Sequence, residues 1–128
     1  MPHLTLEYSV NIGKRVDFAV LCAALHEGLA RAGTFKIQDF KSRGYPAAEF
    51  FIGTGNDNQS FINLDIATFK GKDPEERKRL TEAALAILAD YFADALAATN
   101  CDISVQVTEL ERAVFSRVRS NELLGAAA

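Results

Sequence analysis

The pattern that most constrains this chain is a strand–helix–strand order that occurs twice, with an offset of roughly sixty residues. In each half, apolar residues first alternate with polar ones, then recur at helical spacing, and then alternate again. Residues 2–45 form the first unit, residues 60–110 the second, and residues 112–128 a tail. A right-handed crossover makes each unit a parallel strand pair with its helix on one face. At 128 residues, the chain is expected to be one α/β domain with an internal duplication.

The first unit begins with clear strand and helix signals. Residues 2–9 alternate apolar and polar side chains, which predicts a half-buried strand. Its apolar face consists of Leu4, Leu6 and Tyr8. A helix is predicted over residues 18–32, because Asp17 is a suitable N-cap, Gly33 is a suitable stop, and leucines recur between them at helical spacing.

The second strand of this unit is predicted to be charged on one face. An extended stretch is predicted over residues 37–45, and Pro46 is expected to end it. Because strand side chains alternate between faces, one face is expected to carry Asp39, Lys41 and Arg43. A further short strand is predicted at residues 49–52, followed by a turn rich in Gly and Asn at residues 53–58.

The second unit repeats the plan with a stronger helix start. A strand is predicted over residues 61–69. Its apolar face consists of Ile62, Leu64 and Ile66. The segment 73–76 supplies an N-cap Asp, a Pro at the first helical position and an acidic first turn. The helix is expected to continue to about Ala98, and a last strand to cover residues 103–110.

The predicted elements leave part of the sheet uncovered. Two helices that follow right-handed crossovers cover only one face of a four-stranded sheet. The other face then needs a partner subunit, so we expect an oligomer. The tail over residues 112–128 has weak periodicity, and its last residues are expected to be mobile.

Composition excludes several classes of partner. The formal net charge of −3 and the pI near 5.4 argue against nucleic acid or an anionic membrane as the main partner. No apolar stretch approaches membrane-spanning length, and the N-terminus lacks the basic and apolar regions of a signal peptide. Cys22 and Cys101 lie far apart without a CxxC pattern, which indicates neither a zinc site nor a disulfide framework. We therefore expect free thiols, no metal and a cytoplasmic protein.

The residue after the initiator methionine is a proline. If Met1 is removed, Pro2 becomes an N-terminal secondary amine, a group that no internal residue supplies. An α-amino group has a reference pKa of about 7.7–8, and an apolar pocket or nearby cations lower it, which suits a general base near neutral pH. The alternative is that Pro2 merely starts a strand, where a missing N–H costs little.

Four segments together resemble the tautomerase superfamily, and within it the 5-carboxymethyl-2-hydroxymuconate isomerase family. They are Pro2–Ser9, Asn11–Ile12, Lys41–Arg43 and Gly71–Arg77, and the likeness spans most of residues 2–110. The resemblance implies a mixed four-stranded sheet with two helices on one face, in which the first and third strands are antiparallel neighbours. It also implies a homotrimer whose N-terminal proline shuttles a proton without metal or organic cofactor.

The resemblance further implies a set of site residues. Pro2 is the implied catalytic residue, and it is expected opposite the end of the third strand, close to Lys72. Lys41, Arg43 and Lys72 are the implied substrate-binding cations. Where the family has arginine, this chain has Lys41 and Lys72. Lysine is a compact point charge that does not bind a carboxylate bidentately, so the identity of the substrate stays open.

Each cation also has a simpler interpretation. Lys41 and Arg43 could lie on a solvated strand face and pair with Asp39 or Glu49, and Lys72 could be an ordinary loop lysine.

The function that the resemblance implies is an isomerase of aromatic-compound degradation. It would move a proton within a conjugated dienol or unsaturated oxo acid, with Pro2 as acid and base once Met1 is removed, and with a small-molecule carboxylate as substrate. Two other classes remain open at this point. One is a non-catalytic small-molecule binding or regulatory trimer in which Pro2 is incidental, and the other is a structural subunit.

Overall fold

The computed structural model describes residues 1–55 and 58–122. In chain order, its elements are β1 (His3–Ser9), α1 (Phe18–Ala32), the 3₁₀ turn η1 (Ile37–Asp39), β2 (Lys41–Ala47), β3 (Gln59–Phe69), α2 (Pro74–Tyr91), α3 (Ala93–Ala98), β4 (Asn100–Leu110) and the 3₁₀ turn η2 (Arg112–Val114).

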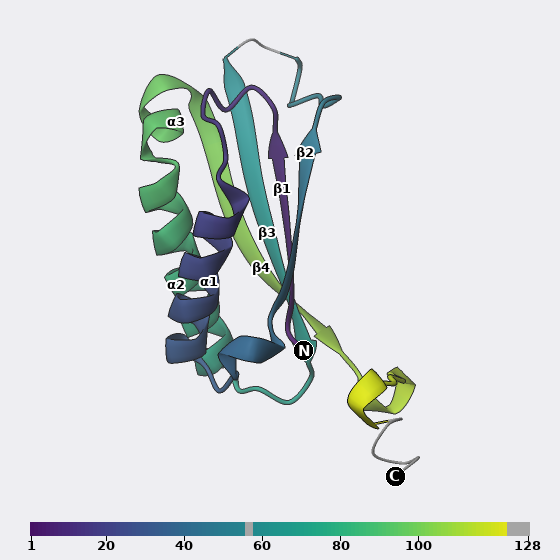
Figure 1. Ribbon diagram of the computed structural model, residues 1–128. Coiled ribbons are helices and arrows are strands. Elements are labelled where there is room, and N and C mark those ends of the chain that lie inside the picture. Colours follow the sequence, from purple (N-terminus) through teal and green to yellow (C-terminus); the bar gives the residue numbers. More distant parts are fainter. Residues whose placement is uncertain (56–57, 123–128) are drawn as a thin grey trace.

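One mixed sheet with the strand order β2-β1-β3-β4 organises the fold. β1 pairs in parallel with β2 and β3 in parallel with β4, so each half is a β-α-β unit. The two units join through an antiparallel pairing of β1 with β3, in which His3 lies opposite Ala67. The predicted fold class is thus confirmed, including the adjacent first and third strands. Figure 1 shows both long helices on one face of this sheet and the C-terminal segment projecting beyond β4.

The core lies between the helices and the sheet. The strands contribute alternate residues, all almost fully buried: Leu4, Leu6, Ile62, Leu64 and Ile66. The helices contribute one stripe each, at the spacing of a single helix face: Leu21, Leu25, Leu29, Leu80, Ala84 and Leu88. Burying one large apolar side chain stabilises the fold by about 1.5–3 kcal/mol, so these two layers supply the main stabilisation.

Both predicted helix starts are confirmed at the level of single hydrogen bonds. The Asp17 carboxylate accepts a hydrogen bond from the Val20 N–H at 3.3 Å. The Asp73 carboxylate accepts one from the Glu76 N–H at 2.8 Å, with Pro74 at the first helical position. These caps satisfy N–H groups that would otherwise lack a partner.

The predicted strand over residues 37–45 is wrong at both ends. Its first part is the η1 turn, so Asp39 does not share a strand face with Lys41 and Arg43. Its end lies beyond Pro46, because β2 is an edge strand. The Lys41 N–H and the Ala47 carbonyl both bond toward β1. By alternation the Pro46 nitrogen points away from β1, where a missing N–H costs no ladder bond.

Two other predicted elements differ from the structure. Residues 49–52 form no strand, and the described sheet consists of β1 to β4. The turn predicted at residues 53–58 lies partly outside the described residues. The long helix does not continue to Ala98, because the backbone leaves the helical region at Phe92 and restarts as α3. This break keeps Phe92 and Ala95 buried while the chain turns toward β4.

The face of the sheet turned away from the helices is polar. Asn63 donates hydrogen bonds to Ser104 at 2.8 Å and to Gln106 at 2.9 Å, and the Thr108 hydroxyl donates to Asp65 at 2.5 Å. In residues 1–55 and 58–122, both long helices lie on the other face (Figure 1), and this face is contacted near its ends by Phe50 at Phe61 and by Arg112 and Phe115 at Phe69. The expected partner subunit for it stays a prediction. Within the described ranges, no helix is both long and apolar enough to cross a membrane.

Candidate active site

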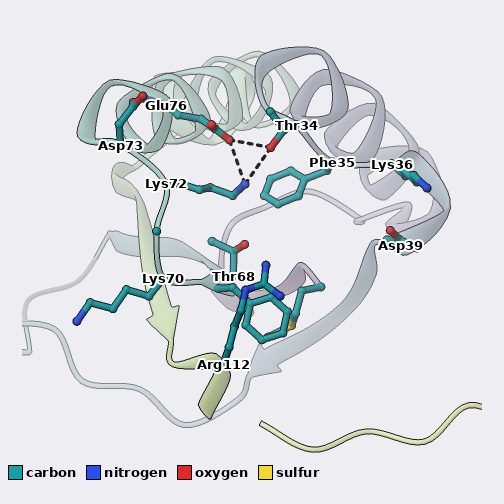
Figure 2. A pocket seen from close by; sticks show the side chains of 13 residues that line it. Thr34, Phe35, Lys36, Asp39, Thr68, Lys70, Lys72, Asp73, Glu76 and Arg112 are labelled. Atoms are coloured by element: carbon teal, nitrogen blue, oxygen red, sulfur yellow. Dashed lines mark hydrogen bonds and ion pairs between the residues drawn. The ribbon is translucent and has the colours of Figure 1, made fainter. Parts of the chain in front are cut away.

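A cavity of about 590 Å³ opens at the end of the sheet where β1 begins and β3 ends. Its walls come from four parts of the sequence: Met1, residues within 34–39, residues within 68–76, and Arg112, the first residue of η2. Figure 2 shows these side chains around the opening. The antiparallel pairing of β1 with β3 brings the N-terminus to this loop, as the register of His3 with Ala67 requires.

The N-terminus itself closes one side of the cavity. Met1 lines it, and Pro2 is buried directly behind Met1. The carbonyl of Pro2 accepts a hydrogen bond from the Lys41 N–H at 3.2 Å, which ties the first residues to β2. Burial lowers the pKa of the N-terminal amine, the charge of Lys41 lowers it further, and Asp39 opposes them. At neutral pH the Met1 amine is therefore more often in its neutral, proton-accepting form than an exposed amine.

Lys72 lies in the cavity but is held by its neighbours. Its ammonium is 3.1 Å from the Glu76 carboxylate and donates a hydrogen bond to the Thr34 hydroxyl at 3.0 Å. It also lies 4.4 Å from the centroid of the Phe35 ring. Figure 2 shows the triangle that Lys72, Glu76 and Thr34 form at the entry to α2. Its charge is thus already compensated within the protomer.

The other two predicted cations lie on the opposite face of the sheet. Ser42 faces α1, where its hydroxyl is 2.6 Å from Nε2 of His26, so the flanking Lys41 and Arg43 point away from the helices. Arg43 contacts Nδ1 of His3 at 3.1 Å. Neither Lys41 nor Arg43 lines the cavity in the single protomer. In the described part of the chain, neither forms the alternative ion pair with Asp39 or Glu49.

Three cations that line the cavity were not predicted: Lys36, Lys70 and Arg112. In Figure 2, Lys36 and Lys70 extend away from the middle of the cavity, whereas Arg112 points toward it. Lys70 lies only two residues before the predicted Lys72, so the sequence could have indicated it as a second cation of the same loop. Arg112 carries no local signal, because its place depends on how the chain turns after β4.

The arrangement can hold an anion beside an amine. The cavity is lined by four cations and three carboxylates: Lys36, Lys70, Lys72 and Arg112, and Asp39, Asp73 and Glu76. The pKa of the Met1 amine is lowered, which favours its neutral, proton-accepting form. Among residues 1–55 and 58–122, no group of three or more His, Cys, Asp or Glu side chains could hold a metal ion. Proton transfer next to a bound carboxylate is the chemistry that these groups support.

Comparison with known proteins places the chain in a family. Residues 2–123 match the family described as 5-carboxymethyl-2-hydroxymuconate isomerase. No curated protein sequence matches the chain. Among solved structures, a 5-carboxymethyl-2-hydroxymuconate isomerase from Deinococcus radiodurans R1 is similar, with 24% identity, a TM-score of 0.82 and coverage of 97% of this chain and 93% of that one.

Two further solved structures share the fold. A 5-carboxymethyl-2-hydroxymuconate delta-isomerase has 18% identity, a TM-score of 0.82 and coverage of 98% of this chain and 93% of that one. A wild-type Q0 fused 4-OT, described as a symmetric trimer, has 14% identity, a TM-score of 0.69 and coverage of 91% and 92%. The match over residues 2–123 supports an isomerase-type function, and the chain belongs to the 5-carboxymethyl-2-hydroxymuconate isomerase family.

Proposed function

We propose that this protein is a cofactor-independent isomerase that moves a proton within a conjugated dienol or an unsaturated oxo acid. The substrate is of the 5-carboxymethyl-2-hydroxymuconate type, and the reaction belongs to aromatic-compound degradation. The observation that carries the proposal is the position of the N-terminus at a cavity that Lys72 and Arg112 also line, where burial and Lys41 lower the pKa of the Met1 amine. Membership of the isomerase family supports it.

The proposed chemistry depends on the removal of Met1. While Met1 is attached, the Pro2 nitrogen is an amide and has no basicity. Once Met1 is removed, the Pro2 nitrogen is a secondary amine at the same wall of the cavity. The neutral amine takes the proton of the enol hydroxyl, and the O–H electron pair stays on the substrate as a dienolate. The protonated amine then returns the proton to a carbon further along the conjugated system, which restores the free base.

The cations have separate roles in this scheme. Burial lowers the pKa of the N-terminal amine and the charge of Lys41 lowers it further, while Lys72 lies at the cavity in which the dienolate forms. Arg43 lies on the far face of the sheet, so a role in substrate binding requires the site of a neighbouring copy. A homotrimer that packs this face against neighbours is part of the proposal. The uncovered polar face and the trimeric fused 4-OT support it.

The proposal is tested with processed and unprocessed protein. Intact mass identifies the form without Met1, and the ketonisation of 2-hydroxymuconate and of phenylpyruvate enol is followed by absorbance. The form without Met1 should be active, and the form that retains Met1 should be inactive because its nitrogen is an amide. In the processed form, Pro2→Ala should lower kcat/KM, since it replaces the secondary amine. Equal turnover by Pro2→Ala, or by the form that retains Met1, would refute Pro2 as the base.

The same experiment distinguishes catalysis from the main alternative, a non-catalytic binding protein. Met1 lines the cavity, so a chain that retains it could serve as a binding module with Pro2 incidental. Tight binding of a carboxylate by the processed protein without any turnover would favour that function over catalysis.

A further inference from the structure

The segment after β4 carries an arginine back to the cavity. Leu110 pairs with Phe69 at the end of the sheet, and its carbonyl accepts a hydrogen bond from the Lys70 N–H at 2.8 Å. The chain then turns through η2, and Phe115 packs edge-on against Phe69 with ring centroids 4.9 Å apart. This turn brings the guanidinium carbon of Arg112 to 4.1 Å from the centroid of the Phe69 ring. The aromatic pair thereby fixes the position of Arg112.

The stacked geometry leaves the hydrogen-bond donors of Arg112 available. Stacking uses the face of the guanidinium, whereas its five N–H groups lie around its edge. Within residues 1–55 and 58–122, no ion pair or side-chain hydrogen bond engages Arg112. Figure 2 shows its side chain directed toward the middle of the cavity, which Thr68 also lines. The edge of the group is thus open toward the space where a ligand would lie.

Arg112 also lies between two cavities. A second cavity, of about 310 Å³, shares Phe69 and Arg112 with the first one and is also lined by Arg117. Arg112 and Phe69 thus line both cavities, and the second one is lined by Phe115 and Glu122 as well. This suits an elongated substrate with more than one carboxylate better than a compact one.

Lys72 is less suited to the same task. Its ammonium is already paired with Glu76 and hydrogen-bonded to Thr34, so a substrate carboxylate there competes with an existing partner. A planar guanidinium binds both oxygens of a carboxylate at once, which an ammonium does not do.

We infer that Arg112 binds a carboxylate of the substrate through its guanidinium edge, so that the segment following β4 determines specificity for acidic substrates. The inference deepens the proposed function and rests on it for the nature of the ligand. Within the cavity, the arginine supplies the bidentate contact that Lys72 does not make.

The test measures binding of trans,trans-muconate to the processed protein by titration calorimetry. This dicarboxylate has the conjugated chain but no enol hydroxyl, so binding is read without turnover. Arg112→Gln should raise Kd roughly tenfold, as expected for a lost charged hydrogen bond, and Arg112→Lys should restore only part of the affinity. Arg31→Gln is the matched control, because Arg31 is an exposed helix residue outside both cavities, and it should leave Kd unchanged.

The inference and the proposed function fail in different ways. Thermal melting first establishes that the Arg112 variants are folded. If Arg112→Gln binds muconate as wild type does, or if wild type does not bind it, the inference is overturned. If muconate binding depends on Arg112 but processed wild type does not isomerise 2-hydroxymuconate, the proposed function fails and the inference stands. If turnover is intact and Arg112→Gln retains the wild-type KM and Kd, the inference alone is wrong.

Discussion

The guanidinium of Arg43 donates a hydrogen bond to Nδ1 of His3 across 3.1 Å, on the sheet face that the helices leave uncovered. Arginine can only donate, so His3 accepts and is neutral, with its proton on Nε2. Burial lowers the pKa of His3, and the adjacent charge of Arg43 lowers it further. The contact therefore fixes both the direction of Arg43 and the protonation state of His3.

Stability should fall in mildly acidic solution. The pKa values of His3 and His26 both lie below the ordinary value of 6.5, mainly because of burial. The unfolded chain then binds more protons than the folded one below pH 6.5, so the free energy of unfolding decreases as pH falls through that region. Urea denaturation at pH 7.5 and pH 5.5 measures the loss. A double variant His3→Gln/His26→Gln should show a smaller pH dependence, and an unchanged slope would contradict the assignment.

Two charges of opposite sign should shift the pKa of the N-terminal amine in opposite directions. Burial lowers the pKa of the Met1 amine, Lys41 lowers it further and Asp39 raises it, and we expect the same two charges to act on the Pro2 amine of the processed chain. In the processed chain, kcat/KM should rise with pH as the amine loses its proton, with a midpoint below that of an exposed amine. Lys41→Gln should move this midpoint to higher pH and Asp39→Asn to lower pH. Lys78→Gln, on the exposed side of α2, should not move it. Shifts of the same sign for Lys41→Gln and Asp39→Asn would exclude this electrostatic origin.

Removing the partner of Lys72 should weaken the fold and strengthen anion binding. The Lys72 and Glu76 side chains are only 17% and 13% exposed, so an uncompensated Lys72 charge is costly. Glu76→Gln should lower the free energy of unfolding by about 1–3 kcal/mol and lower the Kd for muconate. Glu75→Gln, an exposed change in the same turn, is the control for both measurements. Equal effects of the two substitutions would mean that the pair does not restrain Lys72.

The uncovered sheet face should mediate trimer formation. Light scattering should give three times the 14.0 kDa mass of one chain. Asp65→Arg, in the middle of that face, should reduce the mass because it places a large charge in the interface. Asp90→Arg on exposed α2 should leave the mass unchanged. A clean monomer for wild type would refute the trimer.

The fold was largely predictable from local patterns. The alternation of apolar residues at Leu4 and Leu6 predicts which side of β1 is buried, and the strand was predicted correctly. The N-caps Asp17 and Asp73 mark where α1 and α2 begin, and both helix starts were predicted correctly. The break at Phe92 was not, because the sequence around it has ordinary helical spacing. Burial of Phe92 against the sheet, a tertiary effect, decides where the helix bends.

Within the candidate site, only residues that the family resemblance implied could be predicted from the sequence. Lys72 follows β3 closely, and the pairing of β1 with β3 brings it to the N-terminus. Arg112 was missed, since its position depends on the contact of Phe115 with Phe69 across more than forty residues. The spacing of neighbouring residues does not reveal a contact between residues so far apart in the sequence.

The position of β1 between β2 and β3 has a consequence for the order of events during synthesis. β1 emerges from the ribosome before either neighbour, and its second edge is covered only after Phe69 has been made. Until then the N-terminal segment has an unpaired edge and is accessible to an aminopeptidase, whereas the folded sheet buries Pro2 and leaves Met1 only partly exposed at the cavity. The removal of Met1, on which the proposed chemistry depends, should therefore be faster during this interval than after folding. Slower folding would then increase the share of the protein that carries a free proline amine.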